Sequence, residues 1–157
     1  MPPPLLIDLA EIDLNQIVLT RSQIYDILPQ KFEFSLLGGV VHLDPERRTI
    51  VAYADIGESD WWVRGHVPGR TLLPGVLMLE MAAHCCAILA KQIGHDGFIG
   101  FGGVDNCKFR ETVTPPSRLY LLSAEGEYKS RRIVSNTQGV CNGRLVFEAQ
   151  ITGLTLR

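Results

Sequence analysis

The chain has 157 residues, of which 46% are hydrophobic and 20% are charged, as in ordinary globular proteins. This length predicts one domain over residues 1–157 with a buried core, and the composition excludes a fibrous or disordered chain. The formal net charge is -2 and no block of like charges occurs, which argues against nucleic acid as a partner.

The N-terminus, "MPPPLLIDLAEID", has prolines where an export signal has basic residues. We therefore expect no signal peptide, a cytoplasmic location, and a surface arm over residues 1–20. The four cysteines lack the spacing of a zinc or redox site, and we expect buried, reduced thiols and no metal at Cys85, Cys86, Cys107 and Cys141.

Residues 22–30, "SQIYDILPQ", predict a short helix that has Ser22 as its N-cap and stops at Pro29. Two apolar or alternating runs follow, at residues 33–43 and 48–58, with "DPERR" between them. This pattern predicts a β-hairpin.

A long helix is predicted over residues 75–93, where apolar residues recur with the helical period of 3.6. Pro74 is tolerated at its first turn and Gly94 is well placed just past its end. The apolar stretch is interrupted by Glu80 and His84 and is shorter than the ~20 residues of a membrane span. We expect a core helix.

Four further runs rich in β-branched and aromatic residues predict strands at residues 97–111, 118–129, 131–141 and 144–157. Short links between them favour an antiparallel sheet, and the fold class is α+β with the sheet wrapped around the long helix. The glycines of residues 97–103 lack dinucleotide-loop spacing, and a strand follows them, so a nucleotide site is not expected.

The segment "GHVPGRTLLPGVLMLE", residues 65–80, carries the chemistry. His66 stands in a loop stiffened by prolines, and Glu80 stands in an apolar helix where a buried carboxylate is costly unless paired. At the helix start, the backbone N–H groups of Gly75 and Val76 and the helix dipole suit an oxyanion. A histidine base, a carboxylic acid kept partly protonated by burial, and this oxyanion site would together remove a proton next to a carbonyl.

Plainer interpretations remain open for each residue. His66 alone is typical of a surface or capping group, and Glu80 alone of the solvated stripe of a helix. His84 lies four residues after Glu80, so it is expected to contact that carboxylate, in a structural role or with an effect on catalysis. His42 and His95 stand beside turns and are expected at the surface.

Residues 65–80 resemble the signature of the 3-hydroxyacyl-[acyl-carrier-protein] dehydratases of fatty-acid synthesis, which runs Gly-His-Phe-Pro-Gly, four residues, Pro-Gly-Val-Leu, two residues, Glu. The resemblance extends over about residues 20–157 through "QIYDILPQKFEFSLL" and "GVDNCKFRETVTPPSRL". It rests most on six matching positions: His66, Pro68, Gly69, Pro74, Gly75 and Glu80.

The resemblance implies a hot-dog fold in a homodimer or a trimer of dimers. It implies that His66 removes the α-proton of a 3-hydroxyacyl thioester and that Glu80 of the neighbouring subunit protonates the departing hydroxyl. The Gly75 N–H would hold the thioester oxygen. The product would be a trans-2-enoyl thioester on the phosphopantetheine of acyl carrier protein, with no metal or redox cofactor.

The chain departs from the family pattern in several places. Family members usually have Asp-Arg at Gly38-Gly39, Asn at Ser59, Phe at Val67, Gln at His84 and Pro-Gly-Asp at residues 115–117. These differences leave open a specialised paralogue, or an acyl-binding or scaffolding subunit without turnover. A thioesterase on the same fold has less support, because this loop lacks the acidic pattern of those enzymes.

Basic residues occur near the signature and on the strand that follows the long helix. A solvated face is the default interpretation. A phosphopantetheine phosphate and an acidic carrier protein would also suit such a cluster, formed by Arg64, Arg70, Lys108 and Arg110.

Overall fold

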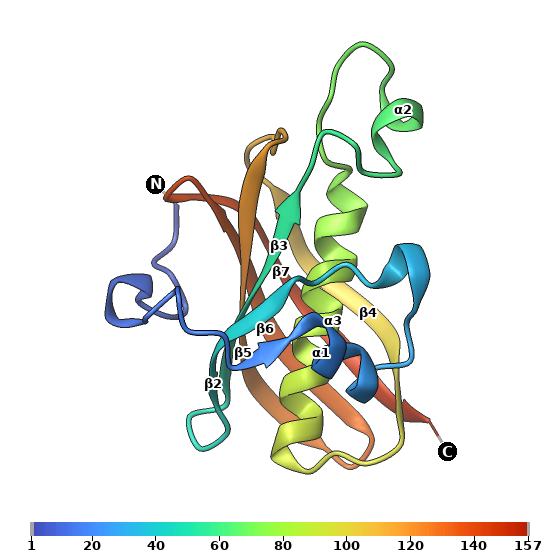
Figure 1. The fold of residues 1–157 in the computed structure, drawn as a ribbon. Helices are drawn as coiled ribbons and strands as arrows, with labels where there is room; N and C mark the ends of the chain where they lie inside the picture. Colours follow the sequence, from blue (N-terminus) through green and yellow to red (C-terminus); the bar gives the residue numbers. More distant parts are fainter. Residues whose placement is uncertain (1, 157) are drawn as a thin grey trace.

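The computed structural model describes residues 2–156 (Figure 1). The helices are α1 (Arg21–Ile27), α2 (Val63–His66) and α3 (Gly75–Ile93), with 3₁₀ turns η1 (Leu9–Glu11) and η2 (Phe32–Phe34). The strands are β1 (Leu19–Thr20), β2 (Gly39–Asp44), β3 (Thr49–Ile56), β4 (Phe98–Phe109), β5 (Ser117–Lys129), β6 (Arg132–Cys141) and β7 (Arg144–Leu156).

The described strands form one seven-stranded sheet in the order β1-β2-β3-β5-β6-β7-β4, and every neighbouring pair is antiparallel. The curved sheet wraps around α3, which contacts β3 to β7 (Figure 1). The predicted α+β class, the hairpin of β2 and β3, and the four later strands are confirmed. β4 lies at one edge of the sheet and β1 at the other.

Helix α3 lies at the centre of the hydrophobic core. Its buried side chains include Leu77, Met81, Ile88 and Leu89, which pack against residues of the sheet such as Phe147. Gly94 ends the helix in the left-handed conformation with φ 109°, as predicted. By length and composition α3 could cross a membrane, but packing inside the sheet accounts for most of its apolar residues.

Helix α1 begins earlier than predicted, and Ser22 is not its N-cap. Thr20 takes that place: its hydroxyl accepts a hydrogen bond from Gln23 N–H, and the Gln23 side chain accepts one from Thr20 N–H. This reciprocal capping box satisfies two backbone donors, which Ser22 alone would not do. Leu28, the residue before Pro29, is extended, so the predicted stop is confirmed.

The strand predicted over residues 33–43 begins only at Gly39. Residues 32–34 form a 3₁₀ turn, and Phe32, its first residue, has a positive φ of 54°. Phe32 and Phe34 are exposed, so no core contact holds this segment in the sheet.

The N-terminal arm packs on the face of the sheet opposite α3, as its position in Figure 1 shows. Gln138 ties the arm down: its side chain accepts a hydrogen bond from Leu6 N–H and donates one to the carbonyl of Pro4. The arm covers a second apolar cluster on this face, formed by Val41, Val51, Tyr53, Leu122 and Val140. Because side chains alternate along a strand, the sheet has an apolar side toward α3 and another toward the arm.

All four described cysteines are free thiols, and Cys107 is less buried than the other three. Burial raises the pKa of Cys86 to about 11, so that thiol stays protonated at neutral pH. The expectation of a surface position is wrong for His95, which is buried between Glu125, at 3.2 Å, and the Tyr128 ring. The Glu125 carboxylate and the Tyr128 ring offset the cost of burying the His95 imidazole.

Gly38 and Gly39 lie under the ring of Tyr53. A Cβ atom at Gly38 would stand 2.6 Å from the ring, and one at Gly39 would stand 2.8 Å from it. The other interactions of this group hold the ring in place, since Arg118 stacks on it at 3.9 Å and also pairs with Asp55. Close packing against Tyr53, on the outer face of the sheet, therefore explains why this chain has Gly38 and Gly39 where family members usually have Asp-Arg.

We predict that Gly38→Ala destabilises the fold by about 1–3 kcal/mol, because the new methyl group overlaps the Tyr53 ring. Urea unfolding measures this. Gly126→Ala is the matched control, because its Cβ would be 3.6 Å from the nearest atom, an ordinary contact. If the clash is the cause, Tyr53→Ala should remove most of the penalty in a double mutant. Equal losses in both Tyr53 backgrounds would contradict it.

Candidate active site

His66 is the last residue of α2, and its side chain is exposed. The buried Trp62 anchors this short helix, and its carbonyl accepts a hydrogen bond from His66 N–H. The imidazole Nδ1 lies 3.0 Å from the carbonyl oxygen of Leu72. A carbonyl oxygen only accepts, so Nδ1 carries the proton and neutral His66 presents an unprotonated Nε2.

The loop between His66 and α3 is tied down at several points. Gly69 has a φ of 83°, which permits the turn closed by the bond from Arg70 N–H to the Val67 carbonyl. Leu73 is buried and donates its N–H to the carbonyl of Val113. His66 therefore stands on a braced segment although it faces solvent.

The start of α3 offers free backbone donors. The N–H groups of Leu77 and Met78 both bond to the carbonyl of Pro74. Within residues 2–156, no acceptor binds the N–H of Gly75 or Val76. These two groups and the positive end of the helix dipole form a site able to bind an oxyanion.

Close packing also explains why a glycine stands at position 75. A Cβ atom at this position would stand 2.9 Å from the ring of Phe109, at the end of β4. That ring stacks on Phe147 with centroids 5.6 Å apart. The absence of a side chain lets β4 pass close to the first turn of α3.

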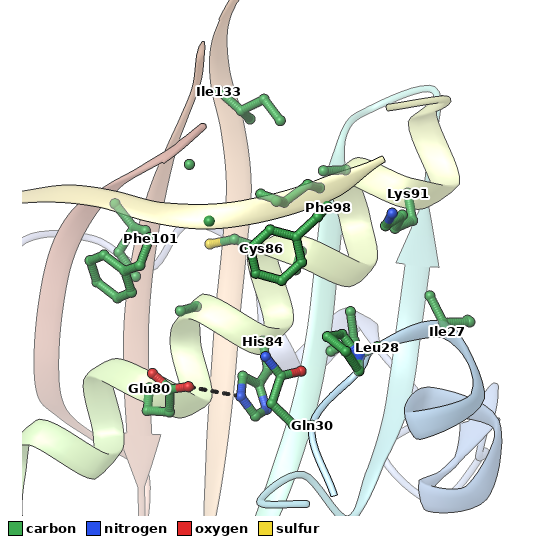
Figure 2. Close-up of a pocket in the computed structure, with 18 of the residues that line it drawn as sticks. Ile27, Leu28, Gln30, Glu80, His84, Cys86, Lys91, Phe98, Phe101 and Ile133 are labelled. Atoms are coloured by element: carbon green, nitrogen blue, oxygen red, sulfur yellow. Dashed lines mark hydrogen bonds and ion pairs between the residues drawn. The ribbon is translucent and has the colours of Figure 1, made fainter. Parts of the chain in front are cut away.

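Glu80 lies in the second turn of α3, and its side chain is 30% exposed. Its Oε1 lies 3.1 Å from Nε2 of His84, so the predicted contact between these two residues is confirmed (Figure 2). The expectation that burial keeps Glu80 partly protonated is wrong. The hydrogen bond from His84 outweighs desolvation and lowers the pKa of Glu80 below its usual value.

Tyr25 also belongs to the group formed by Glu80 and His84, and the sequence alone did not indicate it. Its hydroxyl lies 3.0 Å from Nδ1 of His84 and accepts a hydrogen bond of 2.8 Å from Leu37 N–H. Burial raises the pKa of Tyr25 to about 12. Tyr25 and His84 are 59 positions apart, and no local pattern in the sequence marks the pair.

Glu80 and His84 face a cavity of about 630 Å³ between α1, α3 and β4. Figure 2 shows Phe98 and Phe101 of β4 above α3, and Leu28 on the opposite side of the cavity. Most of the lining is apolar. His66 is not among the described residues that line this cavity.

Residues 28–150 match a family model described as a FabA-like domain. Over 140 residues the chain is 36% identical to the 3-hydroxyacyl-[acyl-carrier-protein] dehydratase FabZ of Enterococcus faecalis, covering 85% of this chain and 96% of that protein. The chain belongs to the FabA-like family. The resemblance drawn from residues 65–80 is thereby confirmed.

Solved structures show the fold of this FabA-like protein. The dehydratase heterocomplex ApeI:P from Xenorhabdus doucetiae aligns with a TM-score of 0.71 at 13% identity, over 85% of this chain and 91% of that chain. A hypothetical thioesterase with coenzyme A from Streptococcus pneumoniae aligns with a TM-score of 0.61 at 11% identity, over 74% and 84%. The predicted hot-dog fold is confirmed.

The four basic residues predicted to contact a carrier protein differ in their surroundings. Arg64 and Arg70 are exposed on α2 and the loop after it. Lys108 and Arg110 flank Phe109 and so lie near the start of α3. Arg110 is paired with Glu148 at 2.7 Å, which leaves part of its charge compensated.

We predict that Glu80→Gln lowers the free energy of unfolding at pH 7 by about 0.5–1 kcal/mol, because a charge-assisted hydrogen bond to His84 becomes a neutral one. The hydrogen bond from His84 holds the folded-state pKa of Glu80 below its usual value, so this stability is present in full above the usual pKa of a glutamate. It is lost as the pH falls through the folded-state pKa. Urea unfolding over a pH series measures the difference.

The matched control is the same substitution in a His84→Ala background, where the donor is absent. There, the difference between Glu and Gln at position 80 should no longer depend on pH. A pH dependence that persists without His84 would show that another group lowers the pKa of Glu80.

Proposed function

We propose that this protein dehydrates 3-hydroxyacyl-[acyl-carrier-protein] to the trans-2-enoyl form in fatty-acid synthesis, as its FabZ relatives are named to do. One observation carries the proposal: His66 and Glu80 occupy the signature positions, and each has its side chain held by a hydrogen bond that leaves a reactive atom free. The family membership supports the substrate class.

In the proposed first step, Nε2 of His66 takes the proton from C2 of the thioester. The bond from Nδ1 to the Leu72 carbonyl supports this role, because it fixes the tautomer and stabilises the imidazolium that forms. The electron pair of the C2–H bond moves toward the thioester carbonyl. Its oxygen would be held by the N–H of Gly75, with Val76 beside it.

In the second step, the C2–C3 double bond forms as the C3–O bond breaks. Glu80 would give a proton to the departing hydroxyl, which leaves as water. Oε2 of Glu80 suits this task because Oε1 is engaged by His84. Solvent returns a proton from His66 to Glu80 after the product leaves, and every step uses acid–base groups of the chain.

We further propose that the site is shared between two copies of the chain. Two features support a homodimer. First, His66 does not line the cavity that holds Glu80. Second, β4 is a twelve-residue edge strand in the described sheet, and it carries exposed apolar side chains at Phe98, Phe101, Val104 and Phe109. A long apolar edge strand favours pairing with another chain.

The acyl chain would occupy the apolar cavity beside Glu80, and acyl carrier protein would deliver it in the cytoplasm. Arg64, Arg70 and Lys108 are the candidate contacts for the phosphopantetheine phosphate or the acidic carrier, because their side chains are exposed on α2, on the loop after it and on β4. Arg110 contributes less under this proposal, because it already pairs with Glu148.

Our first functional prediction concerns the purified protein with a crotonyl or 3-hydroxyacyl thioester. We expect absorbance of the enoyl group to change in the direction set by the starting thioester. His66→Ala and Glu80→Gln should each lower kcat/KM by a factor on the order of 10² or more, because each removes an acid–base group. Circular dichroism confirms that each variant is folded.

Other outcomes separate the remaining functions. No interconversion in either direction would leave an acyl-binding or scaffolding subunit, and a bound acyl thioester in titration calorimetry would identify it. Release of free thiol would indicate a thioesterase. Glu80→Gln at a near-native rate would show that the carboxylate has no catalytic role.

Our second functional prediction uses the symmetry of a shared site. We expect a one-to-one mixture of inactive His66→Ala and Glu80→Ala chains to regain about a quarter of wild-type activity. With free exchange, half the dimers are mixed, and each mixed dimer has one intact site and one doubly broken site. The enoyl thioester assay measures the recovery.

Subunit exchange is verified by mass spectrometry of differently tagged chains. A site within one chain would leave every site in the mixture broken. Continued inactivity despite verified exchange would therefore refute the shared site while leaving the proposed reaction intact.

A further inference from the structure

Three buried groups connect α1 and the segment after it to Glu80. Leu37 N–H donates a hydrogen bond of 2.8 Å to the Tyr25 hydroxyl. This hydroxyl lies 3.0 Å from Nδ1 of His84, and Nε2 of His84 lies 3.1 Å from Oε1 of Glu80. The side chain of His84 is only 3% exposed. Both of its nitrogens are thus engaged inside the protein.

The direction of these hydrogen bonds follows from the chemistry of each group. The Tyr25 oxygen accepts from Leu37 N–H, and its own proton remains available to donate. Donation to Nδ1 makes that nitrogen an acceptor and places the imidazole proton on Nε2. Nε2–H then donates to the Glu80 carboxylate, so every donor in the chain meets an acceptor.

We propose that Tyr25 and His84 are positioning residues, which hold Glu80 through Oε1 and so present Oε2 to the substrate. This inference rests on the proposed dehydration and adds to it a fixed orientation and a fixed tautomer. The phenol ring of Tyr25 and the imidazole ring of His84 lie edge to face, with centroids 5.8 Å apart and an interplanar angle of 73°, and this arrangement aims the Tyr25 hydroxyl at the ring edge of His84.

The surroundings leave His84 as the main influence on the Glu80 carboxyl. Its hydrogen bond is the largest cause of the lowered pKa of Glu80. The residues of β4, β6 and β7 that line the cavity are not ionisable. From α1, α3 and the segment after α1, the titratable or charged groups around the pair are Arg21, Tyr25, Asp26, Lys31, Cys86 and Lys91.

The proposal separates three substitutions. His84→Ala removes the donor to Glu80, whereas His84→Gln retains a side-chain N–H donor on the same helix face. Tyr25→Phe keeps the ring and removes the hydroxyl that selects the tautomer of His84. The matched control is His42→Gln, since His42 bonds to Thr49 on the hairpin and does not line the cavity.

The first test is independent of activity. In ¹⁵N NMR of the wild-type protein, the His84 ring should show the Nε2–H tautomer, and Tyr25→Phe should weaken that preference. In ¹³C NMR, the carboxyl of Glu80 should titrate at higher pH in His84→Ala than in wild type, with His84→Gln between them. A wild-type Nδ1–H tautomer, or a Glu80 titration unchanged by His84→Ala, would overturn the proposal.

The second test is kinetic. His84→Ala should lower kcat about 10-fold or more with little change in KM, and His84→Gln should recover most of the loss. The acid limb of kcat/KM against pH should move to higher pH in His84→Ala, because it follows the pKa of Glu80. The control should match wild type. An active His84→Ala enzyme with a wild-type kcat and pH profile would also overturn the proposal.

The two tests fail in different ways. If wild type lacks dehydratase activity while the NMR results are as expected, the proposed function is wrong and the positioning of Glu80 stands. If wild type is active and the NMR results are contradicted, the reaction stands and Tyr25 and His84 are ordinary core residues.

Discussion

The burial of α3 inside the sheet is the constraint on which the rest of the structure depends. A helix with apolar residues on most of its circumference is stable in water only when other elements cover it. The sheet covers one side, while the open edge at β4 and the segment around α1 border the cavity. The polar side chains of α3 lie along this border or at the exposed end of the helix: Glu80, His84 and Lys91 line the cavity, and Gln92 faces solvent in the last turn.

The same constraint explains why His84 needs Tyr25. A buried imidazole with an unsatisfied nitrogen would cost about 1–3 kcal/mol. Helix α1 packs on α3 and brings the Tyr25 hydroxyl to the nitrogen that Glu80 does not use. Helix α1 therefore closes this side of the core and also supplies Tyr25, which orients His84 beside the Glu80 carboxylate.

Much of the fold was predictable because it depends on local patterns. The spacing of apolar residues and the punctuation by Pro74 and Gly94 define α3, and a turn sequence between alternating runs defines the β2–β3 hairpin. The errors occur where two local preferences compete. Thr20 competes with Ser22 as the cap of α1 and prevails because Gln23 completes the capping box.

The candidate site was predictable only in part, for a related reason. His66 and Glu80 stand in one short segment whose spacing can be read along the chain. The Tyr25–His84 contact and the His95–Glu125 contact join residues 59 and 30 positions apart, and only the folded sheet and helices bring them together. The contact between Glu80 and His84 is local and was predicted, but the sequence does not show that this hydrogen bond outweighs burial and lowers the pKa of Glu80.

That lowered pKa sets a requirement on the proposed acid. A carboxylate stabilised by His84 must gain a proton before it can give one to a leaving hydroxyl, and the side chain of Glu80 is 30% exposed to water. An acyl chain that fills the apolar cavity would displace this water, and desolvation raises the pKa of a carboxyl group. Substrate binding and the hydrogen bond from His84 would then act in opposite directions on the same group. The hydrogen bond would hold Glu80 in place, and a bound acyl chain would shift it toward the protonated form that the proposed reaction needs.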